Sequence, residues 1–286
     1  LNSKDPERQL RVGFVSPDLG LHPVGSLVLG LLENLSVQSL ISICYSSRSP
    51  DIKTNAFKAA ASIWRDAYGQ SDNMLANLIF ADEIDILIDL SGHTGGNRLG
   101  VFASKPAPIQ MSWAGYVSTT GLSAMDYILS DKYSILEDEE QYYQEKVIRM
   151  PDGWVCYSPP EDAPGTVNRP CVQKDYITFA SFSNPAKINE GVITIWSKIL
   201  TSVPGSRLLI KYNGVNSDAN SDRLLGGFKV NGIDVSRITL EGWSPHVKLL
   251  ERYNDVDIAL DTFPFSGGVT TFEALWMGVP VVTVPG

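Results

Sequence analysis

Short apolar runs that alternate with amphipathic segments constrain the fold of this chain more than any other feature. In the first half, runs typical of buried strands cover 10–15, 40–44, 84–90, 109–113 and 127–129. Helical patterns lie between some of these runs, at 54–67 and 73–82. Strands with apolar residues on both faces, connected through helices, are typical of a parallel sheet that is covered on both sides.

A stretch rich in proline, glycine and aspartate, 150–170, interrupts this alternation and reads as a linker. The second half then repeats the pattern, with strands at 177–182, 207–211, 238–240, 257–260 and 279–284 and helices at 189–200, 247–253 and 271–277. We therefore predict an α/β fold of two doubly wound, Rossmann-like domains, 1–165 and 166–286, that face a cleft. Ligands of such domains bind at the carboxyl ends of the strands, where helix N-termini point at them.

Composition limits the classes of partner. The chain has 286 residues and a net charge of −9, so no general field attracts nucleic acid or an anionic membrane. No apolar run reaches the ~18 residues that a membrane span needs. Cys44, Cys156 and Cys171 are widely spaced and form neither a zinc pattern nor a disulfide framework. We expect a reducing compartment, the cytoplasm.

The segment SGGVTTFEALW, 266–276, follows a strand and opens a helix. Gly267 and Gly268 allow a ligand to approach the backbone, and the first turn of a helix has unpaired N–H groups. Val269, Thr270 and Thr271 extend this bend with backbone and hydroxyl donors, and Glu273 is placed to accept ribose hydroxyls. This pattern is typical of a diphosphate site, but a plain helix N-cap with an acidic first turn has the same residues.

Several long motifs resemble the O-linked N-acetylglucosamine transferases, glycosyltransferase family 41. They are LRVGFVSPDLGLHPVGSL (10–27), KPAPIQMSWAGYVSTTG (105–121), MDYILSD (125–131), NPAKIN (184–189) and EALWMGVPVVT (273–283). The similarity covers most of the chain. It implies a GT-B fold and an inverting transfer of a sugar from UDP to Ser or Thr hydroxyls, without a metal or other cofactor.

The resemblance also implies binding partners and a longer protein chain. A UDP-sugar is the expected donor and a protein or peptide the expected acceptor, with N-acetylglucosamine the first choice of sugar. Tetratricopeptide repeats usually precede this region in the family. Family members also continue past VVTVPG, so we expect the C-terminal lobe, 166–286, to be incomplete here.

Matching motifs transfer roles to individual residues. His22 corresponds to a family histidine near the sugar and the acceptor, and imidazole suits proton movement near neutral pH. Lys187 corresponds to the lysine that contacts the UDP phosphates, where a cation stabilises the leaving group. Asn184 stands where a family glutamine contacts the nucleotide. The sequence leaves open whether His22, a water chain or a donor phosphate oxygen accepts the proton.

Two positions depart from the family pattern. Many members have a histidine that packs on the uracil at the position of Leu249, and the nearby histidine here is His246. Either His246 substitutes or the base packs on aliphatic surface. Gly268 and Val269 replace side chains of a family His-Thr-Thr run. Arg252 matches a family arginine near the nucleotide, or lies on the surface of an amphipathic helix.

Further candidates follow strands of the first domain. His93 and Arg98, in GHTGGNR, either face the sugar and acceptor or belong to a tight capped loop. Tyr116, in YVSTTG, is a candidate for the acceptor groove. Three functions remain open: a protein O-glycosyltransferase, a UDP-sugar transferase with another sugar or a non-Ser/Thr acceptor, and a non-catalytic nucleotide-sugar-binding module.

Overall fold

The computed structural model describes residues 2, 3, 5, 7–35 and 40–284. The chain divides into two compact units, 1–158 and 159–286, each with its own hydrophobic core. This division falls inside the proline-rich stretch 150–170, seven residues before the boundary at 165 that the sequence predicts. The stretch has no helix or strand before α5 (Cys171–Lys174).

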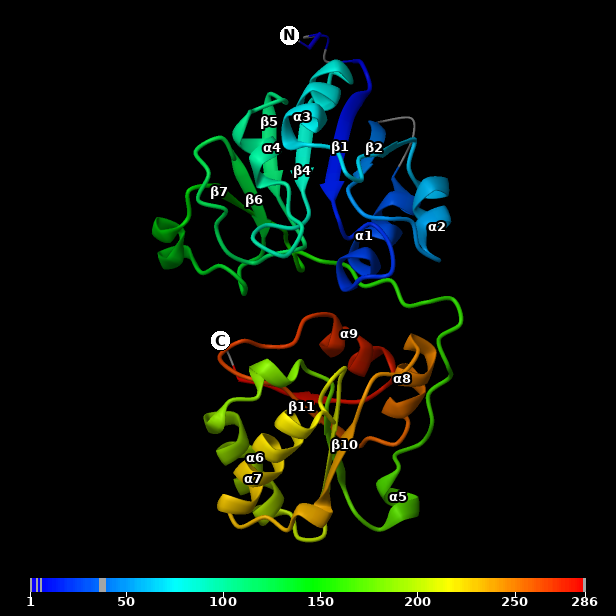
Figure 1. Cartoon of the computed structure of the whole chain (residues 1–286), viewed down its shortest axis with the longest axis vertical. Coiled ribbons are helices and arrows are strands. Elements are labelled where there is room, and N and C mark those ends of the chain that lie inside the picture. The colour runs from blue at the N-terminus through cyan, green and yellow to red at the C-terminus, as the bar shows by residue number, and fades with distance from the viewer. Residues whose placement is uncertain (1, 4, 6, 36–39, 285–286) are drawn as a thin grey trace. The chain divides into compact units, whose positions relative to one another are not determined.

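The first unit is a parallel sheet of seven strands in the order β3-β2-β1-β4-β5-β6-β7 (Figure 1). The strands are β1 (Leu10–Ser16), β2 (Leu40–Ser46), β3 (Ile63–Asp66), β4 (Ile86–Asp89), β5 (Ile109–Ser112), β6 (Tyr127–Ser130) and β7 (Lys146–Arg149). The helices are α1 (Pro23–Asn34), α2 (Thr54–Ala60), α3 (Asp72–Ala81), α4 (Leu99–Ala103) and the 3₁₀ helix η1 (Glu137–Tyr142). The strand order reverses between β1 and β4, which is where a doubly wound fold places its ligand crevice.

Alternation along β1 sends its side chains to two cores. Val12 and Phe14 pack with α1 and α2, whereas Val15 packs with α3 and α4 on the other face. Both faces of the sheet are therefore covered, as parallel sheets require. This arrangement leaves the carboxyl ends of β1, β4 and β5, with the loops that follow them, free to present polar side chains.

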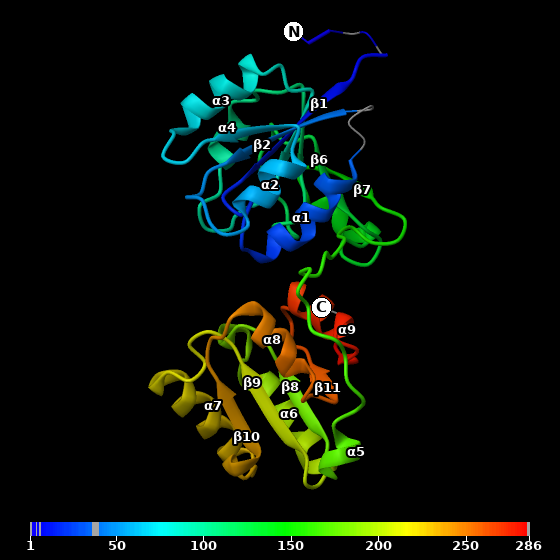
Figure 2. The same ribbon diagram turned by 90° about the vertical axis from the view of Figure 1, so that its right-hand side faces the viewer.

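The second unit is a parallel sheet of five strands in the order β10-β9-β8-β11-β12. The strands are β8 (Thr178–Ser181), β9 (Arg207–Lys211), β10 (Ile238–Glu241), β11 (Ile258–Leu260) and β12 (Val281–Val282). The remaining elements are η2 (Pro185–Lys187), α6 (Glu190–Ser202), α7 (Asp218–Val230), η3 (Val235–Arg237), α8 (His246–Tyr253) and α9 (Val269–Trp276). Helices α6 and α7 pack against one face, and α8 and α9 against the other (Figure 2).

The predicted helix over 54–67 is wrong in its second half. Helix α2 ends at Ala60, Ala61 is extended, and β3 follows as the edge strand beside β2. Ile63 and Trp64 favour a strand, and the pairing with β2 outweighs the helical spacing of the apolar residues. Strand β7 was not predicted. The predicted strand at 279–284 pairs only at Val281 and Val282, and 285–286 lie outside the described residues.

Across the part of the chain that the structure describes, no helix combines the length and the apolar character needed to cross a membrane.

Candidate active site

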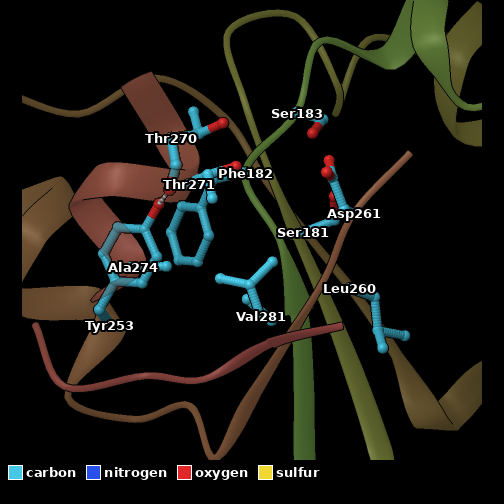
Figure 3. Close-up of a pocket in the computed structure, with 11 residues that line it drawn as sticks. Ser181, Phe182, Ser183, Tyr253, Leu260, Asp261, Thr270, Thr271, Ala274 and Val281 are labelled. Carbon is cyan, nitrogen blue, oxygen red and sulfur yellow. Dashed lines mark hydrogen bonds between the residues drawn. The ribbon is translucent and has the colours of Figure 1, made fainter. Parts of the chain in front are cut away.

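A small pocket lies at the carboxyl ends of β8 and β11, beside the start of α9 (Figure 3). Its lining residues are Ser181, Phe182, Ser183, Tyr253, Ala259, Leu260, Asp261, Thr270, Thr271, Ala274 and Val281. The empty volume is about 240 Å³, including the part open to solvent.

The predicted glycine–threonine bend is the first turn of α9. Gly268 is the N-cap, and Val269, Thr270 and Thr271 are the first helical residues. No carbonyl of the helix can reach the amides of Val269 and Thr270, so these two amides lie open at the positive end of the helix dipole, whereas the Thr271 amide already donates to the carbonyl oxygen of Gly268 at 3.0 Å. Because Thr270 and Thr271 also line the pocket, backbone and hydroxyl donors converge on it.

Asp261, which the sequence reasoning missed, holds this bend in place. Its Oδ1 accepts hydrogen bonds from the amides of Gly267 at 2.7 Å and Thr262 at 2.8 Å, and its Oδ2 accepts one from the Thr283 hydroxyl at 2.9 Å. A Cβ on Gly267 would lie 2.7 Å from Thr271 Oγ1. Only glycine therefore fits between the carboxylate and the helix. The position of Asp261 immediately after an apolar strand is the signal that could have identified it.

Ser181 is the second residue that was missed. It is 1% exposed and lines the pocket, and among the described residues its hydroxyl has no hydrogen-bond partner. Buried hydroxyls are nearly always paired, so an orphan at a pocket wall indicates a partner supplied by a ligand or water. The ring of Phe182 stacks on Tyr253 at 3.8 Å between centroids and forms the apolar side of the pocket (Figure 3).

Lys187 lies against the same bend. Its Nζ donates to the carbonyl oxygen of Ser266 at 2.9 Å and sits 4.1 Å from the centroid of the Phe265 ring. Burial lowers the pKa of Lys187, and the carboxylate of Asp261 opposes this effect. Arg223 fixes the turn that carries the lysine by donating to the carbonyl oxygen of Pro185 at 2.8 Å. The structure therefore brings Lys187 next to the start of α9, as the sequence predicted.

Glu273 and His246 contact each other. The imidazole Nε2 lies 2.6 Å from Glu273 Oε1, and the carboxylate residue is only 5% exposed. This contact joins α8 to α9 one turn beyond the open amides. Leu249, where the family pattern has a histidine, packs at the edge of the core beneath these helices. An aliphatic surface therefore takes the place of that aromatic ring.

Two predicted donor-binding side chains are engaged elsewhere in the second unit. Arg252 binds Glu241 through Nε and Nη2 and Asp255 through Nη1, at 2.5–3.1 Å. It is not among the residues that line the pocket. Asn184 is the N-cap of η2, with its Oδ1 accepting from the Ala186 amide at 3.0 Å. Within the described ranges no hydrogen bond from its amide group is seen, and a nucleotide contact by Asn184 stays a prediction.

In the first unit, His22 is the N-cap of α1. Its Nδ1 accepts a hydrogen bond from the Val24 amide at 3.3 Å and lies 3.5 Å from Asp18 Oδ1. Burial lowers the pKa of His22 against the opposing effect of Asp18, so the imidazole is neutral at neutral pH. Its side chain is 41% exposed, so a substrate can reach it at the carboxyl end of β1.

His93 and Tyr116 lie together on loops that follow β4 and β5. The two rings meet edge to face at 5.6 Å, and His93 Nε2 lies 3.1 Å from the carbonyl oxygen of Thr120. Arg98 points to a different partner: its Nε donates to Asp72 at 2.6 Å, and its Nη2 donates to the carbonyl oxygen of Gln70 at 2.9 Å. This geometry favours a structural role for Arg98 over a contact with the sugar.

The sequence profile of glycosyl transferase family 41 matches residues 2–157 and 166–286. The chain belongs to this family. It is 38% identical over its whole length to a probable UDP-N-acetylglucosamine–peptide N-acetylglucosaminyltransferase SPINDLY of Petunia hybrida, and 36% identical to the counterpart from Arabidopsis thaliana. In each case it spans about a third of the relative's length, 31% and 32%.

Solved structures agree. An O-GlcNAc transferase from Thermobaculum terrenum superposes with a TM-score of 0.94 at 37% identity, covering 99% of this chain and 54% of that one. A lipopolysaccharide outer core galactosyltransferase superposes with a TM-score of 0.62 at 13% identity, covering 95% and 80%. The second similarity shows the fold alone. The predicted GT-B class of two Rossmann-like domains is therefore confirmed.

Proposed function

We propose that this family 41 chain is the catalytic region of a glycosyltransferase that moves a sugar from a UDP-sugar to Ser or Thr hydroxyls of proteins. N-acetylglucosamine is the preferred candidate because related enzymes are named for its transfer. The observation that carries the proposal is the pocket at the start of α9, which Thr270 and Thr271 line beside open helix amides, with Lys187 bonded to the carbonyl oxygen of Ser266 just before the same helix.

The donor diphosphate binds at this turn. Amides at a helix N-terminus bind anions through hydrogen bonds and the helix dipole, without needing a basic surface. Lys187 adds one partly desolvated positive charge, which is worth more there than in water. As the bond from the sugar to the diphosphate breaks, the leaving oxygen gains negative charge, and these groups stabilise it. We propose that this replaces the metal ion that other transferases use.

Glu273 accepts the ribose hydroxyls of the donor. A carboxylate is an acceptor only and suits a vicinal diol. One of its oxygens is occupied by His246, which leaves Oε2 for the ribose. His246 fixes the direction of the carboxylate, and the surface at Leu249 is left for the base.

His22 is the candidate proton acceptor. In a single displacement the acceptor hydroxyl attacks the anomeric carbon, the bond to the diphosphate breaks, and the configuration inverts. The hydroxyl proton passes to His22 Nε2 or to a phosphate oxygen of the donor. Nε2 is basic only when Nδ1 carries the proton and donates to Asp18, whereas bonding to the Val24 amide requires the other tautomer. Substrate binding would have to select the Asp18-bonded tautomer.

Lys187→Ala tests the proposal. It should lower UDP affinity about tenfold or more, because a charge-assisted contact is lost, and should abolish transfer. Lys198→Ala, on the exposed face of α6, is the control and should change neither. The measurements are calorimetric UDP binding, UDP release from UDP-N-acetylglucosamine and from UDP-glucose, and intact mass of a protein acceptor. Wild-type transfer rate in Lys187→Ala would contradict the leaving-group role.

The same assays decide between the alternatives. Leu249 in place of an aromatic ring is the observation that favours a different donor or a binding module. Turnover with another UDP-sugar would favour a transferase with a different sugar. Tight UDP binding by the full-length protein without turnover would favour a non-catalytic module.

A further inference from the structure

A buried carboxylate at the carboxyl end of β4 joins the loops that carry the candidate histidines of the first unit. Asp89 is 1% exposed. Its Oδ1 accepts a hydrogen bond from the Ser91 amide at 3.1 Å, and its Oδ2 accepts from the Gly92 amide at 2.8 Å and the Ser112 hydroxyl at 3.2 Å. A buried carboxylate is costly unless it is bonded in this way, so its contacts define the shape of the loop.

One branch of the network reaches His22. The hydroxyl of Ser91 lies 3.2 Å from that of Ser16, at the end of β1, and both residues are buried. Ser16 Oγ accepts from the Asp18 amide at 2.9 Å, and Asp18 in turn lies 3.5 Å from the imidazole of His22. The loop after β1 is therefore tied to the loop after β4 through two serine hydroxyls.

The other branch reaches His93. Gly92, whose amide Asp89 holds, has φ of +53°, a conformation that favours glycine, and it packs against Tyr116. His93 follows directly and is positioned between the Tyr116 ring and the carbonyl oxygen of Thr120. The direction of the His93 ring therefore depends on backbone that Asp89 fixes.

We propose that Asp89 is a positioning residue that sets both His22 and His93 for the reaction while touching neither sugar nor acceptor. The inference rests on the proposed function only for the role of the histidines. Burial outweighs the hydrogen bonds to the carboxylate and raises the pKa of Asp89 to about 6. The fold thus carries an electrostatic cost at this position, as is common where geometry serves function.

Asp89→Asn tests this inference, with Asp85→Asn as a matched control. Asp85 lies at the opposite end of the same strand, is also buried, and binds Arg8 and the Arg11 amide rather than either loop. The chain has only 3 histidines, so side-chain ¹⁵N NMR reports each imidazole separately, and His246 in the second unit is an internal reference. Asp89→Asn should shift the signals of His22 and His93 but not His246. Asp85→Asn should shift none of them.

Ser91→Ala separates the two branches and provides a variant with less risk of misfolding. It removes the hydroxyl link to Ser16 but keeps the amide that Asp89 binds. It should shift His22 and leave His93 in place. Unchanged histidine signals in both Asp89→Asn and Ser91→Ala, or equal shifts in Asp85→Asn, would overturn the proposal.

Kinetics give a second readout. Asp89→Asn should lower kcat about tenfold or more with KM for the UDP-sugar within about twofold, because the donor contacts lie in the second unit. A rise in KM at constant kcat would overturn the positioning role. If the wild type transfers no sugar, the proposed function fails, while the histidine spectra still decide the role of Asp89.

Discussion

The adjacent glycines at the start of α9 are under different constraints. A Cβ on Gly267 would meet Thr271 Oγ1 at 2.7 Å and Asp261 Oδ1 at 3.0 Å, whereas a Cβ on Gly268 would meet nothing within 4 Å. The threonine hydroxyl and the carboxylate both need the space that Gly267 leaves. Removing that space should therefore damage the anion site before it damages the fold.

Gly267→Ala should lower UDP affinity by about tenfold, because the Thr271 hydroxyl must rotate away from the pocket. Gly226→Ala is the control: it lies inside α7, where a Cβ meets nothing within 4 Å. That change should leave UDP affinity unchanged and stabilise the chain by roughly 0.5–1 kcal/mol. Equal UDP affinity in the two variants, measured by calorimetry, would show that the bend does not contact the nucleotide.

His246 and Glu273 should act as one unit in nucleotide binding. Glu273→Gln and His246→Ala should each weaken UDP by about three- to tenfold, and the double variant should be little worse than either. Lys248→Ala, an exposed pair partner of Glu251 on the same helix, is the control. The same variants should also be titrated with 2′-deoxy-UDP and 3′-deoxy-UDP. The loss of affinity caused by each substitution should be smaller for the analogue that lacks the hydroxyl bound by Glu273. Fully additive losses would contradict a shared role.

At this scale, sequence predicted what depends on residue type and missed what depends on neighbours. The glycine–threonine bend was identified from its residue pattern and Lys187 from a family motif, and the structure brings them together. Ser181 escaped notice because an unpaired hydroxyl is visible only once the surrounding packing is known. Arg252 was a candidate for a donor contact, but its guanidinium group binds Glu241 and Asp255. Sequence alone does not show that these carboxylates surround it, because the fold brings Glu241 next to α8.

Among the elements, β4 has carboxylates of opposite electrostatic character at its two ends. Burial raises the pKa of Asp89, at the carboxyl end, to about 6 despite its hydrogen bonds. At the amino end, burial also acts to raise the pKa of Asp85, but hydrogen bonds from Arg8, the Arg11 amide and Asn2 outweigh it and lower the pKa to about 2. In its ionised form Asp85 therefore stabilises the fold, whereas ionised Asp89 destabilises it.

The two groups predict opposite pH dependences. Folded Asp89 holds its proton more tightly than the unfolded chain does, so the wild type should lose stability relative to Asp89→Asn as pH rises from about 4 to about 6, by on the order of 3 kcal/mol. Folded Asp85 releases its proton more readily, so the advantage of the wild type over Asp85→Asn is complete above about pH 4 and declines as pH falls toward 2. Urea midpoints of the three proteins from pH 3 to 7 measure both trends. If the urea midpoints of wild type and Asp89→Asn changed in parallel with pH, the raised pKa of Asp89 would be contradicted.

Strands were predicted more reliably than their boundaries. Apolar runs identified the core strands β1, β2 and β4, because both faces of each are buried. Strand β3 is half-exposed at the sheet edge, and its residues also continued the helical spacing of α2. Only pairing with β2 distinguishes the two conformations, and pairing is not a local property.

For the whole molecule, the net charge and the local site act in opposite directions on the binding of an anionic donor. A net charge of −9 disfavours an anionic ligand, so any affinity for a nucleoside diphosphate must come from local contacts. In the second unit these contacts are concentrated in residues that follow β8 and β11 and open α9. The account therefore depends on a single place on the surface.

Titration of the ¹⁵N-labelled chain with UDP, followed through backbone amide signals, tests this claim most directly. The account predicts saturable shifts of the Gly268, Val269 and Thr270 amides at UDP concentrations up to about 1 mM, the usual upper end of enzyme KM values. Lys187→Ala should weaken the shifts. Binding of UDP that perturbs other residues while these amides stay fixed would contradict the account.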